Sequence, residues 1–267
     1  MIGALRYEWA RITSIRSTWW ITAIAFVLAF GFSLLIGHGI SSEPQAGGLS
    51  ASYAAVITQG ASTGFAPVLV AYLMGLLGVF TFGHEYRHGM IRATLTAVPR
   101  RWTVLGAKAL VVVGWALVVS VVCLALGVLA GQITLRGVGF SVTGGDLPRV
   151  MAGFVVYVCL FTLVGLAIAA VVRSQAAALG LLLLIPLVVE NVLRLVITLP
   201  NAFNDVEGVV RYFPFDAGSR MLVLFPLNAG EVFGPIPLGP LSGGVTFAVF
   251  SVVVLALGGL LFVRRDA

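Results

Sequence analysis

Charged side chains are scarce in this sequence. Asp, Glu, Lys and Arg together make up 10% of its 267 residues, whereas 60% of the residues are hydrophobic. Soluble domains carry about 25% charged residues, and a soluble chain of this length could not hide so much apolar surface. The scarcity of charge therefore argues against a soluble enzyme or binding module and predicts an integral membrane protein.

Lysine is almost absent, because all but one of the 16 basic residues are Arg and the exception is Lys108. A P-loop needs a Gly-Lys-Ser or Gly-Lys-Thr step, in which the Lys and the hydroxyl contact phosphate and magnesium. Lys108 instead lies in the run Gly106-Ala107-Lys108-Ala109, so the sequence contains no P-loop. If ATP drives this protein, a partner chain must supply the ATPase site.

Cysteine and histidine are also rare, with 2 and 3 residues. Cys123 and Cys159 both lie in apolar runs, which argues against a disulfide framework or a cysteine metal site and predicts buried free thiols. The net charge of +6 does not indicate a nucleic-acid partner. The basic residues lie beside apolar runs, where Lys and Arg set membrane topology.

The sequence contains several long apolar runs. A helix needs about 20 apolar residues to span a bilayer. We therefore predict a single all-α transmembrane domain over residues 1–267, and Lys108 would snorkel from its third span to the interface. The six predicted spans are at about 19–37, 64–82, 104–133, 150–172, 176–199 and 243–263. Residues 40–63 and 134–148 are expected to be loops, and 200–240 a long extracellular segment.

Residues 1–18 are expected to form an amphipathic helix in the membrane interface. Apolar side chains recur there at helical spacing: Ile2, Leu5, Trp9, Ile12 and Ile15. Arg6 and Arg11 flank this stripe, but Glu8 and Arg16 fall within its apolar sector, so the pattern is imperfect. A simple charged lead-in to the first span is the alternative.

The basic residues predict the orientation. With six spans, eleven of the 16 basic residues lie on the side of both termini and four on the opposite side, while Arg194 lies inside the fifth span. Loops rich in Arg stay in the cytoplasm. Both termini and the segment between spans two and three should therefore be cytoplasmic in a multi-pass protein of the cell membrane.

The segment after span two contains His84-Glu85-Tyr86-Arg87-His88, which fits the H-E-x-x-H pattern of zinc proteases. On a helix His84 and His88 would lie one turn apart, with Glu85 as the general base. A catalytic zinc needs a third protein ligand, and the remaining histidine, His38, would lie at the opposite membrane face. A membrane-embedded zinc metalloprotease is therefore kept as an alternative function.

The same segment also suits a short cytoplasmic helix parallel to the membrane. Gly89 would bend the chain, residues 90–98 would form the helix, and Pro99 would end it. Arg100 and Arg101 would then face lipid headgroups or a partner protein. An ordinary loop that obeys the positive-inside rule is the alternative.

This segment resembles the cytoplasmic segment of ABC-2-type transporter permeases, the six-span membrane subunits of ABC exporters. The run Glu85-Tyr86-Arg87-His88-Gly89 is similar to the E-Y-x-x-G step of that family, although Met90 stands where the family often has Thr or Ser. Three further features of the family follow in order: Leu95, then Val98-Pro99-Arg100-Arg101, then Lys108. The lead-in helix, the six spans and the Pro-containing turn at residues 212–218 are also similar.

The resemblance implies a permease subunit that exports a lipophilic or amphipathic substrate and has no catalytic, metal or cofactor site of its own. Two permease chains, identical or homologous, would assemble in membrane lipid with two copies of an ABC ATPase subunit, which would bind ATP and Mg. The residues implied in ATPase coupling are Glu85, Gly89, Arg92, Leu95, Pro99, Arg100 and Arg101, with Arg173 and Gln175 in a second contact. A membrane scaffold or immunity protein without transport is a further alternative.

The fifth span contains Glu190, Asn191 and Arg194. Such groups are costly inside a membrane and usually face a cavity or a partner. Glu190 and Arg194 are four residues apart and can pair along one helix face, and Pro186 is expected to kink the helix one turn earlier. We expect the three residues to line the outer substrate path or its gate, and a purely structural ion pair is the alternative.

Overall fold

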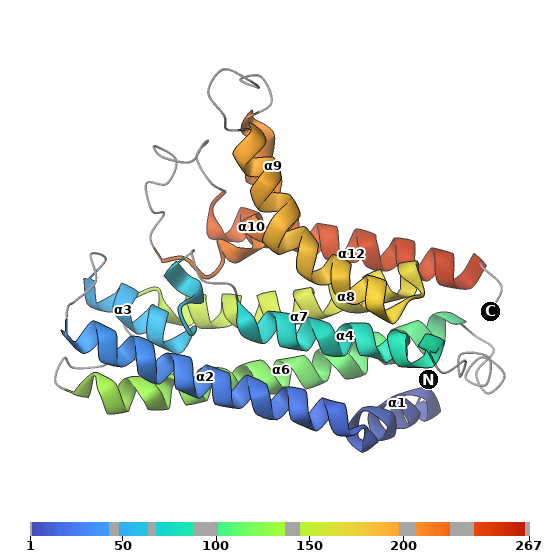
Figure 1. Cartoon of the computed structure of the whole chain (residues 1–267), viewed down its shortest axis with the longest axis horizontal. Coiled ribbons are helices and arrows are strands. Elements are labelled where there is room, and N and C mark those ends of the chain that lie inside the picture. Colours follow the sequence, from blue (N-terminus) through green and yellow to red (C-terminus); the bar gives the residue numbers. More distant parts are fainter. Residues whose placement is uncertain are drawn as a thin grey trace.

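The computed structural model describes residues 2–42, 48–63, 68–87, 101–136, 145–197, 207–224 and 238–264. Within these ranges all regular elements are helical (Figure 1). The α-helices in chain order are α1 (Ile2–Ser14), α2 (Arg16–Ser42), α3 (Gly48–Ile57), α4 (Leu69–Arg87), α6 (Arg101–Thr134), α7 (Leu147–Val172), α8 (Gln175–Leu184), α9 (Glu190–Ile197), α10 (Pro214–Ser219) and α12 (Pro240–Arg264). Three short elements join them: the 3-10 helices η1 (Ala61–Thr63) and η4 (Glu207–Tyr212), and the π-helix η3 (Ile185–Val189).

The prediction of an all-α membrane protein is confirmed. Five described stretches are long and apolar enough to cross a membrane: Arg16–Ile40, Arg101–Thr134, Leu147–Val172, Gln175–Ile197 and Pro240–Arg264. The remaining predicted span, the second in chain order, corresponds to α4, whose apolar part Leu69–Glu85 is shorter. The predicted bounds of 64–82 lie about five residues too early, because the helix begins at Leu69 and ends at Arg87.

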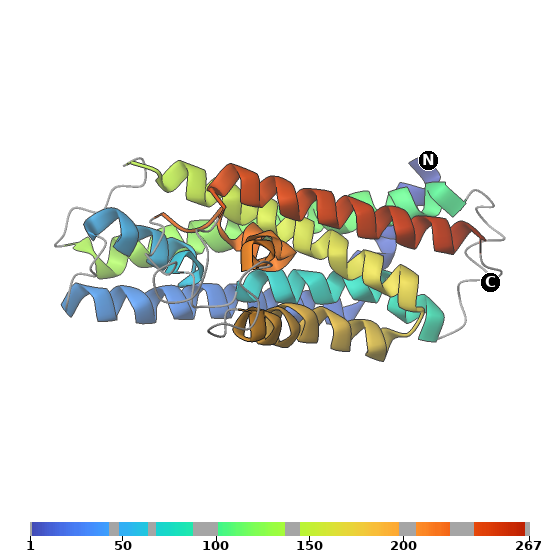
Figure 2. The same ribbon diagram turned by 90° about the horizontal axis from the view of Figure 1, so that it is seen from above.

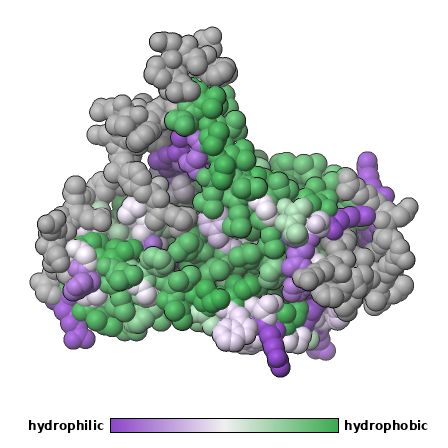
Figure 3. Space-filling model, viewed as in Figure 1, coloured by the Kyte–Doolittle hydropathy of each residue, from purple (hydrophilic) through white to green (hydrophobic). Residues whose placement is uncertain are grey.

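The long helices run side by side along one axis, with α7 at the centre of the bundle (Figures 1 and 2). α7 packs against α4, α12, α6 and α8, and its closest partner is α4. Helix α1 and the end of α12 lie at the same end of the bundle (Figure 1). A broad apolar surface covers the middle of the bundle, and polar side chains gather toward its two ends (Figure 3). This distribution is typical of a bundle that stands across a membrane.

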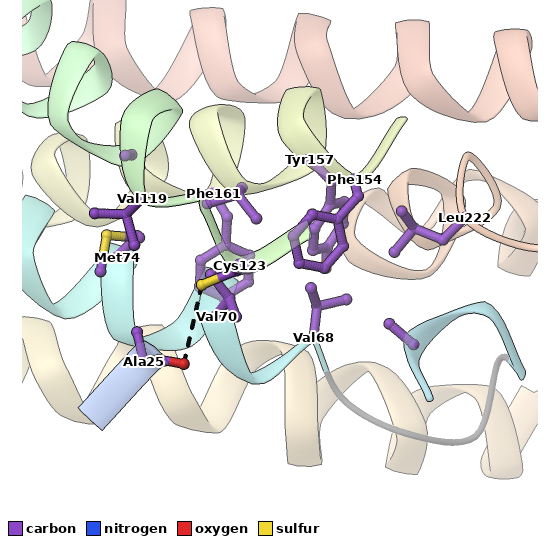
Figure 4. Packing of buried hydrophobic residues seen from close by; sticks show 14 of the residues in the cluster. Ala25, Val68, Val70, Met74, Val119, Cys123, Phe154, Tyr157, Phe161 and Leu222 are labelled. Atoms are coloured by element: carbon purple, nitrogen blue, oxygen red, sulfur yellow. Dashed lines mark hydrogen bonds between the residues drawn. The ribbon is translucent and has the colours of Figure 1, made fainter. Parts of the chain in front are cut away.

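Apolar side chains from every described α-helix except α9 form the core, part of which is drawn in Figure 4. Ala25 of α2, Met74 of α4, Cys123 of α6 and Phe161 of α7 are all fully buried. The Cys123 thiol donates to the carbonyl of Ala25 over 3.9 Å. Both cysteines are free; Cys123 is buried, and Cys159 is partly buried. The prediction of buried free thiols is confirmed for Cys123, whereas Cys159 is free but only partly buried.

The prediction of a loop over residues 40–63 is wrong. Helix α2 continues to Ser42, and α3 then packs against α6 and α2. Residues 53–57 of α3 are buried, and the hydroxyl of Ser33 donates to the carbonyl of Val56 over 2.7 Å. The Gly and Ser residues of this segment suggested a loop, but its short apolar run is sufficient to form a buried helix.

Gly127 lies where α6 approaches the backbone of α3. A Cβ at this position would be 2.6 Å from the Ile57 carbonyl oxygen and 2.9 Å from its Cα. We expect Gly127→Ala to lower the free energy of unfolding by about 1–3 kcal/mol through overpacking. Denaturant titration of the purified protein in detergent, followed by circular dichroism, measures the change.

Gly114 provides the matched control in the same helix, because a Cβ there meets no atom within 4 Å. Gly114→Ala should leave stability unchanged or raise it slightly, since Ala has the higher helix propensity. Equal stability of the two variants would contradict the close approach of α3 to α6.

Candidate functional site

Four charged side chains meet at the end of the bundle that contains α1. The ammonium group of Lys108 in α6 donates to Glu8 of α1 over 2.8 Å and to Glu85 of α4 over 2.5 Å. Arg11 of α1 contacts the other oxygen of Glu8 over 2.6 Å, and its Nη1 lies 4.0 Å from Glu85. We refer to Glu8, Arg11, Glu85 and Lys108 as the four-charge cluster.

The four-charge cluster is buried. The exposed fractions of Lys108, Glu8 and Glu85 are 1%, 2% and 3%, and that of the Arg11 side chain is 13%. Lys108 also donates to the carbonyl of Thr81 over 3.2 Å. Charges are expensive to bury unless they are paired and hydrogen-bonded. The two positive and two negative groups therefore hold α1, α4 and α6 in one arrangement.

Helix α1 carries Glu8 into this position. Its buried face consists of Ala4, Glu8 and Ile12, which are spaced one turn apart. Ile2 and Trp9 of the predicted apolar stripe are 70% and 52% exposed. Glu8, which interrupted the stripe in the sequence, is thus part of the face of α1 that packs on the bundle, and it pairs with Lys108 there.

The expectation that Lys108 snorkels to the interface is wrong. Helix α6 begins at Arg101, so Lys108 lies about 10 Å further along its axis. Helices α1 and α4 cover it there and supply two carboxylates. Its ammonium group also lies 5.2 Å from the centre of the Phe82 ring, within the range of a cation–π contact. These partners replace the water that a snorkelling lysine would reach.

Glu85 is the residue that a zinc protease would use as its general base. Its Oε1 instead accepts a hydrogen bond from Lys108. The ring of His84 stacks on Phe80, with ring centres 4.8 Å apart. The second histidine of the motif, His88, lies outside the described residues. Glu85 therefore has an ion-pair role in the bundle, and this geometry disfavours the protease interpretation.

Most of the other residues implied in ATPase coupling lie outside the described residues. These are Gly89, Arg92, Leu95, Pro99 and Arg100.

Arg101, in contrast, is the first residue of α6. Its Nη1 donates to the carbonyls of Phe262 and Val263 over 3.0 and 3.2 Å. These carbonyls belong to the last turn of α12, where they lack partners within the helix. Arg101 thus joins the start of α6 to the end of α12.

The turn between α7 and α8 packs on α4 near the four-charge cluster. Arg173 ends α7 in the left-handed conformation with φ 57°, and the hydroxyl of Ser174 accepts from the N–H of Ala177 to cap α8. A Cβ on Gly83 would lie 2.9 Å from Cγ of Gln175. Gln175, in the segment implied in the second ATPase contact, therefore adjoins α4 two residues before Glu85.

A second polar group joins α9 to α10. The carboxylate of Glu190 accepts from the backbone N–H groups of Phe215 and Asp216, both over 3.1 Å. Arg194 pairs with Asp216 over 2.7 Å, and Asp216 also pairs with Arg220 over 3.1 Å. We refer to Glu190, Arg194, Asp216 and Arg220 as the α9–α10 clasp. The contacts of Glu190 and Arg194 with α10 were not predicted from the sequence.

The helix bends just before this clasp. Pro186 lies in the π-helix η3, and α9 turns away from the axis of the bundle beyond it (Figure 1). The side-chain amide of Asn191 donates to the carbonyls of Pro186 and Leu187 over 3.2 and 3.0 Å. The predicted kink is confirmed, and Asn191 stabilises it by satisfying carbonyls of the irregular turn.

Sequence reasoning missed Glu8 and Arg11 in the four-charge cluster, and Asp216 and Arg220 in the α9–α10 clasp. One signal in the sequence could have pointed to them. Each acidic residue has apolar neighbours, where an unpaired charge is costly, so each was expected to have a charged partner. Their partners were not identifiable, since Glu8 and Lys108 are 100 residues apart.

Comparison with known protein families identifies the family of this chain. The model of the ABC-2 family transporter proteins matches residues 5–189 of this chain. The matched range includes the complete four-charge cluster and ends one residue before Glu190. A comparison with curated proteins gives no match.

Proposed function

This chain belongs to the ABC-2 family of transporter proteins, and on that premise we propose that it exports a lipophilic or amphipathic substrate with the energy of a separate ATPase subunit. The chain is a membrane permease of an ABC transporter. Two permease chains and two ATPase chains would form the complete machine, with ATP and Mg bound by the ATPase chains.

The four-charge cluster is the observation that carries this proposal. Glu85 lies three residues before residue 88, where the undescribed part of the coupling segment begins. It is bound to α6 through Lys108, which is in turn bound to α1 through Glu8. A displacement of the coupling segment by the ATPase would therefore move α4, α1 and α6 together. Such rigid-body movement of packed helices is an established way to switch access between the two sides of a membrane.

The proposed orientation places both termini in the cytoplasm of a cell-membrane protein. Helix α1 and the end of α12 lie at the same end of the bundle (Figure 1). Trp9, Trp19 and Trp20 are exposed near that end, and Trp is enriched where membrane proteins meet lipid headgroups. The excess of basic residues on this side supports the cytoplasmic assignment.

The α9–α10 clasp is proposed to line the outer substrate path or its gate. Glu190 is 6% exposed and holds the start of α10 against α9. The clasp lies beyond the bend at Pro186, where α9 packs mainly on η3 and η4. Opening this end of the path would require the polar contacts between α9 and α10 to separate.

Binding to an ATPase tests the proposal. The permease is co-expressed with a P-loop ATPase from a neighbouring reading frame, and the retained ATPase is measured after affinity purification. Arg92→Glu and Pro99→Ala are expected to weaken ATPase binding at least about tenfold, which corresponds to 1.4 kcal/mol. Arg136→Glu, on an exposed arginine at the far end of α6, is the control and should bind normally.

Unchanged ATPase binding by both coupling-segment variants would contradict the coupling assignment. If no ATPase is retained even by the unmodified chain, the scaffold interpretation is supported instead. Stoichiometric zinc in the purified protein that is lost in His84→Ala would support the metalloprotease.

A further inference from the structure

The last span, α12, runs from α10 to the end of the bundle where α1 lies (Figure 1). At that end its last turn is bound by Arg101, which directly follows the undescribed residues 88–100 of the coupling segment. We propose that Arg101 is a positioning residue through which the coupling segment moves α12, and that α12 passes this movement to the α9–α10 clasp. The inference rests on the proposed function and adds a route from the ATPase to the outer end of the bundle.

The first turn of α6 packs directly on the end of α12. The guanidinium Nη1 of Arg101 donates to the carbonyls of Phe262 and Val263 over 3.0 and 3.2 Å. The last carbonyls of a helix carry partial negative charge, so a cation binds them more strongly than a neutral donor does. A Cβ on Gly259 would lie 2.6 Å from Cζ3 of Trp102, so the Trp102 ring lies directly on the backbone of α12. The two helices cannot shift relative to each other at this end without breaking these contacts.

Helix α4, which precedes the coupling segment, contacts the same end of α12. The rings of Phe82 and Phe262 meet edge to face, with their centres 5.2 Å apart. The ammonium group of Lys108, in the four-charge cluster, lies over the Phe82 ring. The helices that precede and follow the coupling segment therefore both contact the last turn of α12. A displacement of this segment would act on α12 as well as on α1, α4 and α6.

The geometry of α12 suits the transmission of an axial movement. The helix is continuous from Pro240 to Arg264, which is about 37 Å at 1.5 Å per residue. Its one proline is the first residue, where it does not interrupt the helix. Where α12 meets α7, Gly258 faces Ala167 and Ala170, so no large side chain interlocks the two helices at this point. Packed helices with such contacts can slide by a small amount.

At its other end α12 holds α10. A Cβ on Gly243 of α12 would clash with the carbonyl oxygen of Ala217 in α10. The ring centre of Phe215 in α10 lies 5.5 Å from that of Phe247 in α12. The N–H group of Phe215 donates to Glu190. Phe215 therefore contacts α12 through its ring and α9 through its backbone, and it joins α12 to the α9–α10 clasp.

Helix α9 can follow α10, because the chain bends just before it. Helix α8 packs on α4 and α7, whereas α9 packs mainly on η3 and η4. The element η3 is a π-helix that contains Pro186, and π-helical turns recur at functional sites. A shift of α12 is therefore expected to move α10 and, through Glu190, to move α9 about this bend. A purely structural role of Arg101 would leave the outer end unmoved when the ATPase binds nucleotide.

Distances between spin labels test the inference in the complex with the ATPase, with and without ADP and vanadate. The outer pair is Val192 of α9 with Val156 of α7, and the inner pair is Leu110 of α6 with Val156; all three residues are exposed. Cys123 and Cys159 are replaced by Ala, and an excess of cysteine-free chain ensures that each distance lies within one protomer. Without further substitutions, ADP and vanadate are expected to shift both distances by at least about 2 Å, the scale of helix shifts in switching proteins.

Gly259→Val separates α12 from the first turn of α6, because its side chain would occupy the space of the Trp102 ring. It should keep the inner shift and lose at least half of the outer shift. Arg101→Gln should give the same loss, whereas Arg101→Lys, which keeps a cation for the helix C-terminus, should retain the full shift. Gly106→Val is the matched control and should retain both shifts, because a Cβ on Gly106 of α6 meets no atom within 4 Å.

An unaltered outer shift in Gly259→Val or Arg101→Gln would overturn the inference, as would an equal loss in Gly106→Val. Loss of ATPase binding in Arg101→Gln would also overturn it, because Arg101 would then act by contact with the ATPase. Circular dichroism verifies each fold, and the two Arg101 variants decide if Gly259→Val does not fold. The proposed function fails separately: if the chain without these substitutions retains no ATPase or shows no inner shift, the coupling itself is wrong, and this route with it.

Discussion

Replacement of Lys108 by Met is expected to lower the free energy of unfolding by about 3–5 kcal/mol, the range found when one partner of a buried ion pair is removed. Met has a similar volume, so the change acts mainly through charge. It would leave the carboxylates of Glu8 and Glu85, which are 2% and 3% exposed, with Arg11 as their remaining cation. Unfolding in detergent, followed by circular dichroism against denaturant concentration, measures the loss.

The double variant Lys108→Met with Glu85→Gln distinguishes loss of charge balance from loss of packing. It removes one positive and one negative charge and leaves the pair between Glu8 and Arg11 intact. We expect it to recover at least half of the stability lost in the single variant. A loss in the double variant equal to the sum of the losses in Lys108→Met and Glu85→Gln would contradict the cluster, because the two residues would then show no coupling free energy.

Replacement of Glu190 by Ala is expected to release α10 from α9. The buried N–H of Phe215 and the partly buried N–H of Asp216 would lose their acceptor, at a cost of about 1–3 kcal/mol for the buried donor and less for the other. Spin labels at the exposed residues Val192 and Val245 report the result. Their distance distribution should broaden in Glu190→Ala.

Arg194→Gln is the comparison within the same clasp. The pair between Arg194 and Asp216 is partly exposed, with side-chain exposures of 26% and 18%, so its loss should cost less than about 1 kcal/mol. An unchanged distance distribution in Glu190→Ala would contradict the clasp. The gate assignment is wrong if Glu190→Gln and Arg194→Gln assemble with the ATPase, hydrolyse ATP and export at the normal rate.

Hydropathy located the membrane helices well. The predicted spans 104–133 and 150–172 compare with α6 at Arg101–Thr134 and α7 at Leu147–Val172. Long apolar runs have a direct physical cause in the thickness of the bilayer, so their bounds can be read from one sequence. Helix α3 was missed because its short apolar run is flanked by Gly and Ser residues that are typical of loops.

The charged sites were harder to predict, because their meaning depends on residues far away in the chain. Glu85 and Lys108 were both noted for their resemblance to a family pattern, yet nothing in the sequence showed that they pair. Glu8 was regarded as an imperfection in an amphipathic stripe. Helical periodicity describes neighbours within one helix, whereas this site is formed by three helices.

The structure of the α9–α10 clasp has a consequence for biosynthesis. Glu190 precedes Phe215, whose N–H group it binds, by 25 residues. At about 5–20 residues per second, the ribosome needs about 1–5 seconds to supply that partner. During this interval the carboxylate requires an aqueous or protein-lined environment, such as the interior of the translocation channel. Lys108, in contrast, is synthesised after both of its carboxylate partners. The fifth and last spans are therefore expected to leave the insertion machinery together, after the earlier helices have already entered the lipid.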